Sequence, residues 1–110
     1  MDVDKLESLI SKAEIEYKRG DAAAAIRCAK KAVTCCGCRA KVIALRIFIA
    51  RCYSKLGKFE ESNKIYRNLL KERVYIAPVV FGIFYNNFSC TEAKKMKLNL
   101  VLVKSCLLLP

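Results

Sequence analysis

The sequence lacks the residues and motifs on which catalysis usually depends. None of its 110 residues is histidine, which is the commonest general base and metal ligand in enzymes. It also contains no glycine-rich phosphate loop, no nucleophile elbow and no catalytic pair of carboxylates. The sequence therefore predicts a non-enzymatic protein that needs no cofactor and takes no small-molecule substrate.

Long apolar runs are also missing. The stretch 76–85 is short, and the stretch 98–109 is interrupted by Asn99 and Lys104, whereas a membrane-spanning helix needs about 20 apolar residues. The start of the chain, with Asp2 and Asp4, does not have the basic and apolar regions of a leader. The seven cysteines are odd in number, which favours free thiols. We expect a cytoplasmic protein in a reducing setting, with no membrane partner.

Acidic residues are absent from the stretch 22–59, which carries nine positive charges. The nine residues are Arg27, Lys30, Lys31, Arg39, Lys41, Arg46, Arg51, Lys55 and Lys58. The formal net charge of the whole chain is +11. Because such an excess weakens the compact state by self-repulsion, we expect it to serve an anionic partner.

Apolar residues recur at helical spacing along most of the chain. This pattern predicts helices over 4–19, 22–35, 39–56, 59–75 and 78–87. Gly37 is expected to end the second helix by adopting the left-handed conformation. Ser89 and Glu92 form a capping box that predicts a sixth helix over 89–109, although leucines alternate there as in a strand.

The chain contains an internal repeat. A shift of 37 residues aligns 18–22 with 55–59, and a shift of 32 aligns Gly82 with Ala50 and Tyr85 with Tyr53. The small residues Ala50 and Gly82 would let paired helices approach closely. The sequence therefore predicts a single all-α domain, 1–110, of three antiparallel helical hairpins over 4–37, 38–75 and 76–110, stacked as a short α-solenoid.

The second unit carries a recognisable pattern: Ala50, Tyr53, Gly57, Phe59 and Tyr66 follow a small–Tyr–Gly–aromatic–aromatic order. In this respect the chain resembles the tetratricopeptide repeat (TPR) family, although no unit opens with tryptophan. The resemblance implies a protein that binds peptides or proteins in a groove lined by the first helix of each unit. The stretch 78–87 has no basic residue, so the carboxylate-clamping activity known in that family is not expected here.

The cysteines permit two interpretations. Cys35 and Cys38 have the separation of a zinc half-site, and Cys28 and Cys52 could complete a four-thiolate site if their helices pack together. A second Cys-x-x-Cys motif is absent, however, and Cys28 and Cys52 lie at apolar helix positions. We therefore favour cysteine as a small hydrophobic residue and predict no metal.

The basic residues of 22–46 form the predicted RNA-binding surface, because solvated helix faces usually mix charges and this one does not. Its residues are Arg27, Lys30, Lys31, Arg39, Lys41 and Arg46. Phe48 and Tyr53 are interpreted as core, so base stacking is not expected. The alternative is a cytosolic TPR-type adaptor whose groove, lined by Lys12, Arg46 and Arg51, holds an acidic peptide or protein partner.

The stretch 74–91 carries no charge. We predict that Phe81, Phe84 and Phe88 contact a protein neighbour, because a terminal repeat normally has a polar outer face. The combined prediction is a structural or accessory component of a ribonucleoprotein assembly. The ribosome is the favoured example, with ribosomal RNA and protein neighbours as partners.

Overall fold

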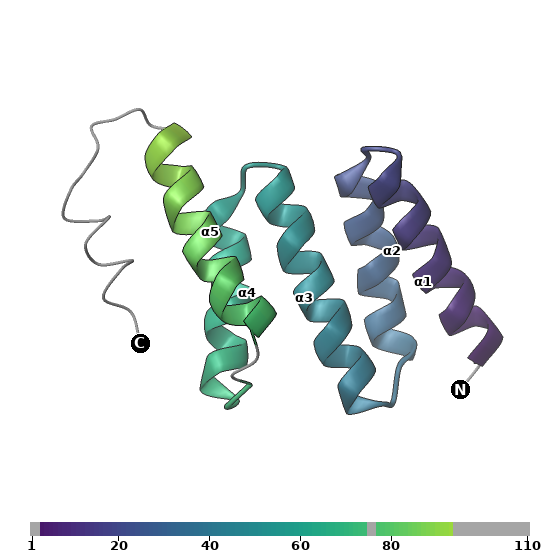
Figure 1. Cartoon of the computed structure of the whole chain (residues 1–110). Coiled ribbons are helices and arrows are strands. Elements are labelled where there is room, and N and C mark those ends of the chain that lie inside the picture. Colours follow the sequence, from purple (N-terminus) through teal and green to yellow (C-terminus); the bar gives the residue numbers. More distant parts are fainter. Residues whose placement is uncertain (1–2, 75–76, 94–110) are drawn as a thin grey trace.

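The computed structural model of the protein describes residues 3–74 and 77–93. Its elements are α1 (Val3–Lys18), α2 (Ala22–Cys35), α3 (Arg39–Lys55), α4 (Phe59–Lys71) and α5 (Ala77–Ala93), with no strand among the described residues. Figure 1 shows these helices side by side and alternating in direction, with α1 at one edge and α5 at the other. The prediction of an all-helical protein is confirmed for this part of the chain. Within the described ranges, no helix is both long and apolar enough to cross a membrane.

Helix α3 lies at the centre of the packing. Each helix packs against the next one in the chain, and α3 also contacts α5. Leu45, Ile49 and Cys52 of α3 belong to one core cluster with α1 and α2, and Ile47 and Ala50 belong to a second with α4 and α5. This double contact explains why α3 is apolar almost all round.

Alanine allows α2 to sit close to its neighbours. Ala25, Ala29 and Ala32 are completely buried within the first core cluster. Their small side chains let the backbones of adjacent helices approach, because little volume separates the helices. The remaining face of α2 therefore points to solvent and carries its cations.

Three helices end in the same type of turn. A residue with positive φ follows α1, α3 and α4: Gly20 at 91°, Gly57 at 80° and Arg73 at 65°. In each case the next N–H group donates to a carbonyl five residues earlier, as in a Schellman motif. These bonds are Asp21 to Glu16, Lys58 to Tyr53 and Val74 to Leu69, each 2.9 Å. The turn at Arg73 ends α4 at Lys71, so the predicted extension of this helix to residue 75 is wrong.

The end of α2 differs from its prediction. Gly37 does not adopt a positive φ. Cys36 leaves the helix in an extended conformation, and its N–H donates to the carbonyl of Val33 at 3.3 Å. The chain therefore turns before Gly37, which has no left-handed role.

Helix α5 is longer than its prediction because it continues past Asn86 and through Ser89. The side chain of Asn86 is 1% exposed and donates from Nδ2 to Ser62 Oγ at 2.7 Å and to Asn63 Oδ1 at 2.8 Å. This asparagine joins α5 to α4, so it does not end the helix. Ser89 accordingly lies inside α5 and does not cap a new one, which corrects the capping-box prediction.

The remainder of the predicted sixth helix, 94–109, lies outside the described residues. This segment is the predicted second helix of the third hairpin. At Gly82, α5 approaches α4 closely, because a Cβ atom added there would collide with the ring of Tyr66. The predicted approach is between the paired helices of one unit, and the partner helix of that unit lies outside the described residues. Tyr66 itself is buried in the second core cluster. Glycine is therefore required where α5 crosses α4.

Candidate nucleic-acid interface

Three of the six predicted RNA-binding residues lie together on α2. Arg27, Lys30 and Lys31 are exposed, and their spacing of three and four residues places them on one helix face. Lys30 Nζ lies 5.6 Å from the ring centroid of Tyr53 on α3. The ion pairs in the described part of the chain involve other cations, Arg19, Arg39 and Arg46. No described carboxylate therefore neutralises the α2 cations, which we call the α2 basic face.

Two other predicted residues, Arg39 and Arg46 of α3, face a carboxylate. The Arg46 guanidinium donates to both oxygens of Glu72 at 3.0 Å, and Arg39 Nη2 lies 4.0 Å from the same side chain. The hydrogen bonds from Arg46 hold the pKa of Glu72 below its ordinary value. Arg46 therefore forms a bidentate ion pair, in which Glu72 opposes its charge.

The sixth residue, Lys41, borders a cavity of about 230 Å³ between α1 and α3. Glu14 and Phe48 line the same cavity. Lys41 thus faces α1, whereas Arg46 faces Glu72. The six predicted residues therefore do not form one surface. The three residues of α2 lie together, whereas Arg39 and Arg46 lie near Glu72 and Lys41 lies beside α1.

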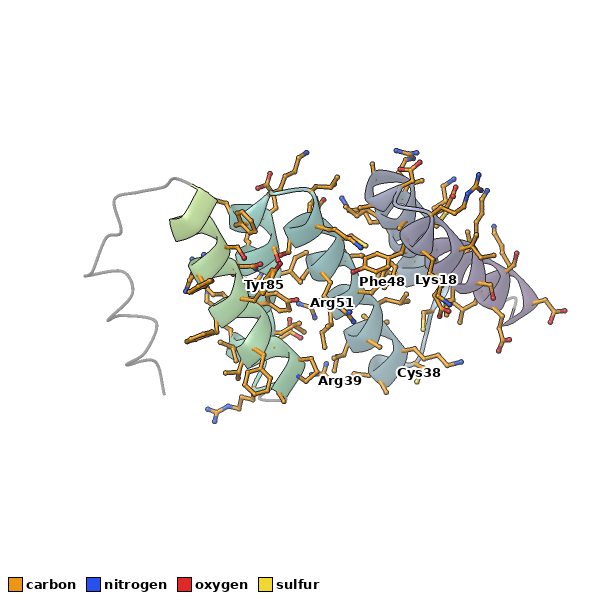
Figure 2. The ribbon with its side chains drawn as sticks, turned by 45° about the horizontal axis from the view of Figure 1, so that its top comes forward. Lys18, Cys38, Arg39, Phe48, Arg51 and Tyr85 are labelled. Atoms are coloured by element: carbon orange, nitrogen blue, oxygen red, sulfur yellow. The ribbon has the colours of Figure 1, made fainter. Side chains whose placement is uncertain are left out.

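A larger cavity, of about 440 Å³, lies among α1, α3, α4 and α5. We call it the aromatic cavity, because its lining includes Tyr17, Phe81 and Tyr85 together with the cations Arg51 and Lys55. None of the described residues that line it is acidic. Figure 2 shows Tyr85, Arg51, Phe48 and Lys18 following one another across one face of the molecule, with Arg39 and Cys38 near the start of α3.

Cation–aromatic contacts organise this cavity. Lys55 Nζ lies 4.4 Å from the ring centroid of Tyr17, and Tyr17 packs against Phe48 with ring centroids 5.4 Å apart. On the other side, Phe81 and Tyr85 are 70% and 61% exposed. The cavity therefore presents aromatic faces and positive charge to solvent at the same place.

Two buried oxygen atoms of this cavity have no hydrogen-bond partner within the described residues. They are Ser54 Oγ and Asn86 Oδ1, and both residues line the aromatic cavity. A buried polar atom without a partner costs about 1–3 kcal/mol. Such atoms are exceptional in folded proteins.

Sequence reasoning named Phe81 as a protein contact and aligned Tyr85 with Tyr53, but it did not bring these two residues together with the cations of α3. Phe81 and Tyr85 lie in the charge-free stretch, 30 or more positions after Arg51, so their proximity depends on the packing of α5 beside α3. The repeat offered a signal, because it aligns Tyr85 with Tyr53 and thereby places α5 as the equivalent of α3 in the next unit. Arg51 is the one residue of the predicted adaptor groove that lines the aromatic cavity; Lys12 is exposed on α1, and Arg46 binds Glu72.

The three predicted protein-binding phenylalanines are all exposed on α5. Phe81 lines the aromatic cavity, whereas Phe84 and Phe88, which are 41% and 54% exposed, do not. Their contact with a protein neighbour stays a prediction.

The five described cysteines do not gather into a metal site. No group of three or more potential ligands occurs within the described residues. Cys28 and Cys52 are buried in the first core cluster, whereas Cys38 is exposed. Burial raises the pKa of Cys52 to about 11. The backbone N–H groups of Lys41 and Ala40, at the start of α3, lower the pKa of Cys38.

Comparisons of the chain with protein-family models, with curated protein sequences and with solved structures gave no match. Fold class alone does not define a function. The basis for a functional proposal is therefore the chemistry of the α2 basic face and the aromatic cavity.

Proposed function

We propose that the protein is a non-catalytic, TPR-like helical component of a cytoplasmic ribonucleoprotein assembly, such as the ribosome, and that the α2 basic face binds RNA phosphates. The observation that carries this proposal is the presence of three exposed cations on one helix face with no described carboxylate beside them. Lysine and arginine at such a face attract phosphates and release the counterions that surround RNA.

Packing supports this role. Helix α2 is held between α1 and α3 through its buried alanines, so its cations project from a fixed backbone. Contacts of this kind position a protein on RNA without reading the sequence. Phe84 and Phe88 on α5 give the same module a separate apolar surface for a protein neighbour.

An adaptor that binds an acidic peptide is the second candidate, and Arg51 supports it. This exposed arginine borders the aromatic cavity, where none of the described lining residues carries a carboxylate. The two candidates differ in their ligands: RNA binding should depend on the α2 basic face, whereas peptide binding should depend on Arg51 and leave Arg27 and Lys31 without a role.

The test is fluorescence anisotropy with a structured RNA at low and at physiological salt. The double variant Arg27→Glu/Lys31→Glu is compared with Lys64→Glu/Arg67→Glu, which reverses two exposed charges of α4 and gives the same net charge. We expect the α2 variant to weaken binding by about 10-fold or more at low salt and the α4 variant to weaken it much less, since phosphate contacts dominate affinity. Absence of RNA binding at low salt, or equal effects of the two variants, would contradict the proposal.

A further inference from the structure

We propose that the aromatic cavity binds one unpaired nucleotide of the RNA. The base stacks on Tyr85, an N–H group of the base donates a hydrogen bond to Asn86 Oδ1, and Arg51 and Lys55 hold a neighbouring phosphate. This inference rests on the proposed RNA-binding function. It adds a second contact, made by a single-stranded segment, to the phosphate contacts of the α2 basic face.

The first support comes from the hydrogen bonds of Asn86. Its Nδ2 group already donates to Ser62 Oγ at 2.7 Å and to Asn63 Oδ1 at 2.8 Å, so both N–H groups of the amide are used. The atom that remains is Oδ1, which can only accept. A ligand that reaches this buried atom must therefore bring a donor, and the Watson–Crick edge of every nucleobase carries an N–H donor.

The second support is the combination of aromatic rings with positive charge. Phe81 and Tyr85 are among the most exposed apolar side chains of the described residues, and they share the cavity with Arg51 and Lys55. Proteins that bind single-stranded nucleic acid combine exposed aromatic rings, on which bases stack, with cations that follow the phosphates. The aromatic cavity has both components within one space.

The size and aromatic lining of the cavity favour a nucleotide over an acidic peptide side chain. A volume of about 440 Å³ lies within the range of small-molecule sites, about 300–1,000 Å³. A glutamate or aspartate side chain could reach Arg51, but it has no flat ring to stack on the exposed rings of Phe81 and Tyr85, as a base has.

The experiment measures the binding of the full chain to three single-stranded probes of equal length: oligouridylate, an abasic oligonucleotide that keeps the phosphates, and an oligomer of N3-methyluridine, which lacks the N–H donor. The wild-type protein is expected to bind oligouridylate roughly 5- to 150-fold more tightly than the abasic probe, because each stacked base contributes in this range. The methylated probe should bind more weakly than oligouridylate, since it cannot donate to Asn86.

Tyr85→Leu should abolish the preference for oligouridylate over the abasic probe. Tyr85 is mostly exposed, so this variant should fold, and a thermal melt checks that it does. Phe88→Leu is the matched control, because it removes an exposed ring of the same helix outside the cavity.

A second pair of variants tests the phosphate contact. Arg51→Gln should lower the salt dependence of oligouridylate binding by the equivalent of about one phosphate contact. Arg67→Gln removes the same amount of charge elsewhere and should leave the salt dependence unchanged.

The outcomes separate this inference from the function on which it rests. If RNA binding depends on Arg27 and Lys31 but oligouridylate and abasic probes bind equally, the cavity proposal is wrong and the α2 proposal stands. If no nucleic acid binds at low salt, both are wrong. If an oligoglutamate peptide binds in a manner that depends on Tyr85 while oligouridylate does not, the cavity belongs to an acidic peptide and the inference is overturned.

Discussion

Helices α2 and α3 share one unopposed run of positive charge in the sequence, yet their charges have different environments in the fold. The α2 cations face solvent without a described carboxylate, whereas Arg46 of α3 makes two 3.0 Å hydrogen bonds to Glu72, 26 positions later in the chain. Lys41, Arg51 and Lys55 border cavities. Charge density along a sequence therefore does not equal charge density on a surface, because packing can supply the missing carboxylate from another helix.

The two helices also begin differently. Asp21 caps α2, since its carboxylate accepts a hydrogen bond from the Ala24 N–H at 3.0 Å. Cys38 occupies the equivalent position of α3. Its side chain makes no well-formed capping hydrogen bond, although the nearby N–H groups of Lys41 and Ala40 favour its thiolate form and lower its pKa. A capping side chain satisfies one of the N–H groups that lack a partner in the first turn. The start of α2 is therefore better stabilised than the start of α3.

The largest effect concerns cysteine reactivity at the junction of the two helices. Cys28 and Cys52 are buried in α2 and α3, and Cys38 between them is exposed. Its lowered pKa gives it more thiolate at neutral pH, whereas the pKa of Cys52 is raised to about 11. We expect iodoacetamide to modify Cys38 at least about 10-fold faster than Cys28 or Cys52, because the thiolate is the nucleophile. Mass spectrometry of the native protein measures these rates; equal rates in native protein would contradict the predicted environments.

Removal of the α2 cap gives the next effect. Asp21→Ala should lower the free energy of unfolding by about 1 kcal/mol, because the Ala24 N–H loses its acceptor. Asp21→Ser is the control, since serine can accept the same hydrogen bond and should retain most of the stability. Urea denaturation of the three proteins measures the difference. If alanine and serine destabilise equally, the cap does not act as described.

The converse change should improve the start of α3. Cys38→Ser introduces a side chain that caps well at a position where cysteine forms no capping bond, and it should raise the free energy of unfolding by about 0.5–1 kcal/mol. Cys38→Ala, which removes the thiol without adding an acceptor, separates capping from loss of sulfur. A gain with alanine as large as that with serine would exclude capping as its cause.

The smallest effect concerns the ion pair between Arg46 of α3 and Glu72. The pKa of Glu72 is lowered from its ordinary value of 4.5 by the hydrogen bonds from Arg46, so the pair stabilises the fold fully above the ordinary value and loses this contribution as pH falls through the lowered pKa. We expect Glu72→Gln to be slightly less stable than wild type at neutral pH, since exposed pairs contribute little. The difference should shrink below about pH 4.5 in urea denaturation. A difference that is constant with pH would contradict this account.

The spacing of apolar residues and the turn glycines predicted helices α1 to α4. Features that depend on contacts between distant parts of the chain could not be predicted in this way. Helical spacing and the turns at Gly20 and Gly57 depend on neighbouring residues, so the sequence reveals them. The continuation of α5 through Asn86 depends on Ser62 and Asn63, more than 20 positions away. The site shows the same division: the exposure of the α2 cations follows from helix periodicity, but the meeting of Arg51 with Tyr85 requires the packing of α5 against α3.

The measurement that tests the account most directly is the salt dependence of RNA affinity for two matched double variants. Arg27→Gln/Lys31→Gln removes two of the three positive charges of α2, and Arg39→Gln/Arg46→Gln removes two positive charges from α3. If the α2 cations bind phosphates and the α3 arginines remain with Glu72, the first variant lowers the slope of log affinity against log salt by about 2, and the second leaves it nearly unchanged. Equal slopes for the two variants, or a larger loss in the α3 variant, would contradict the assignment of RNA binding to α2.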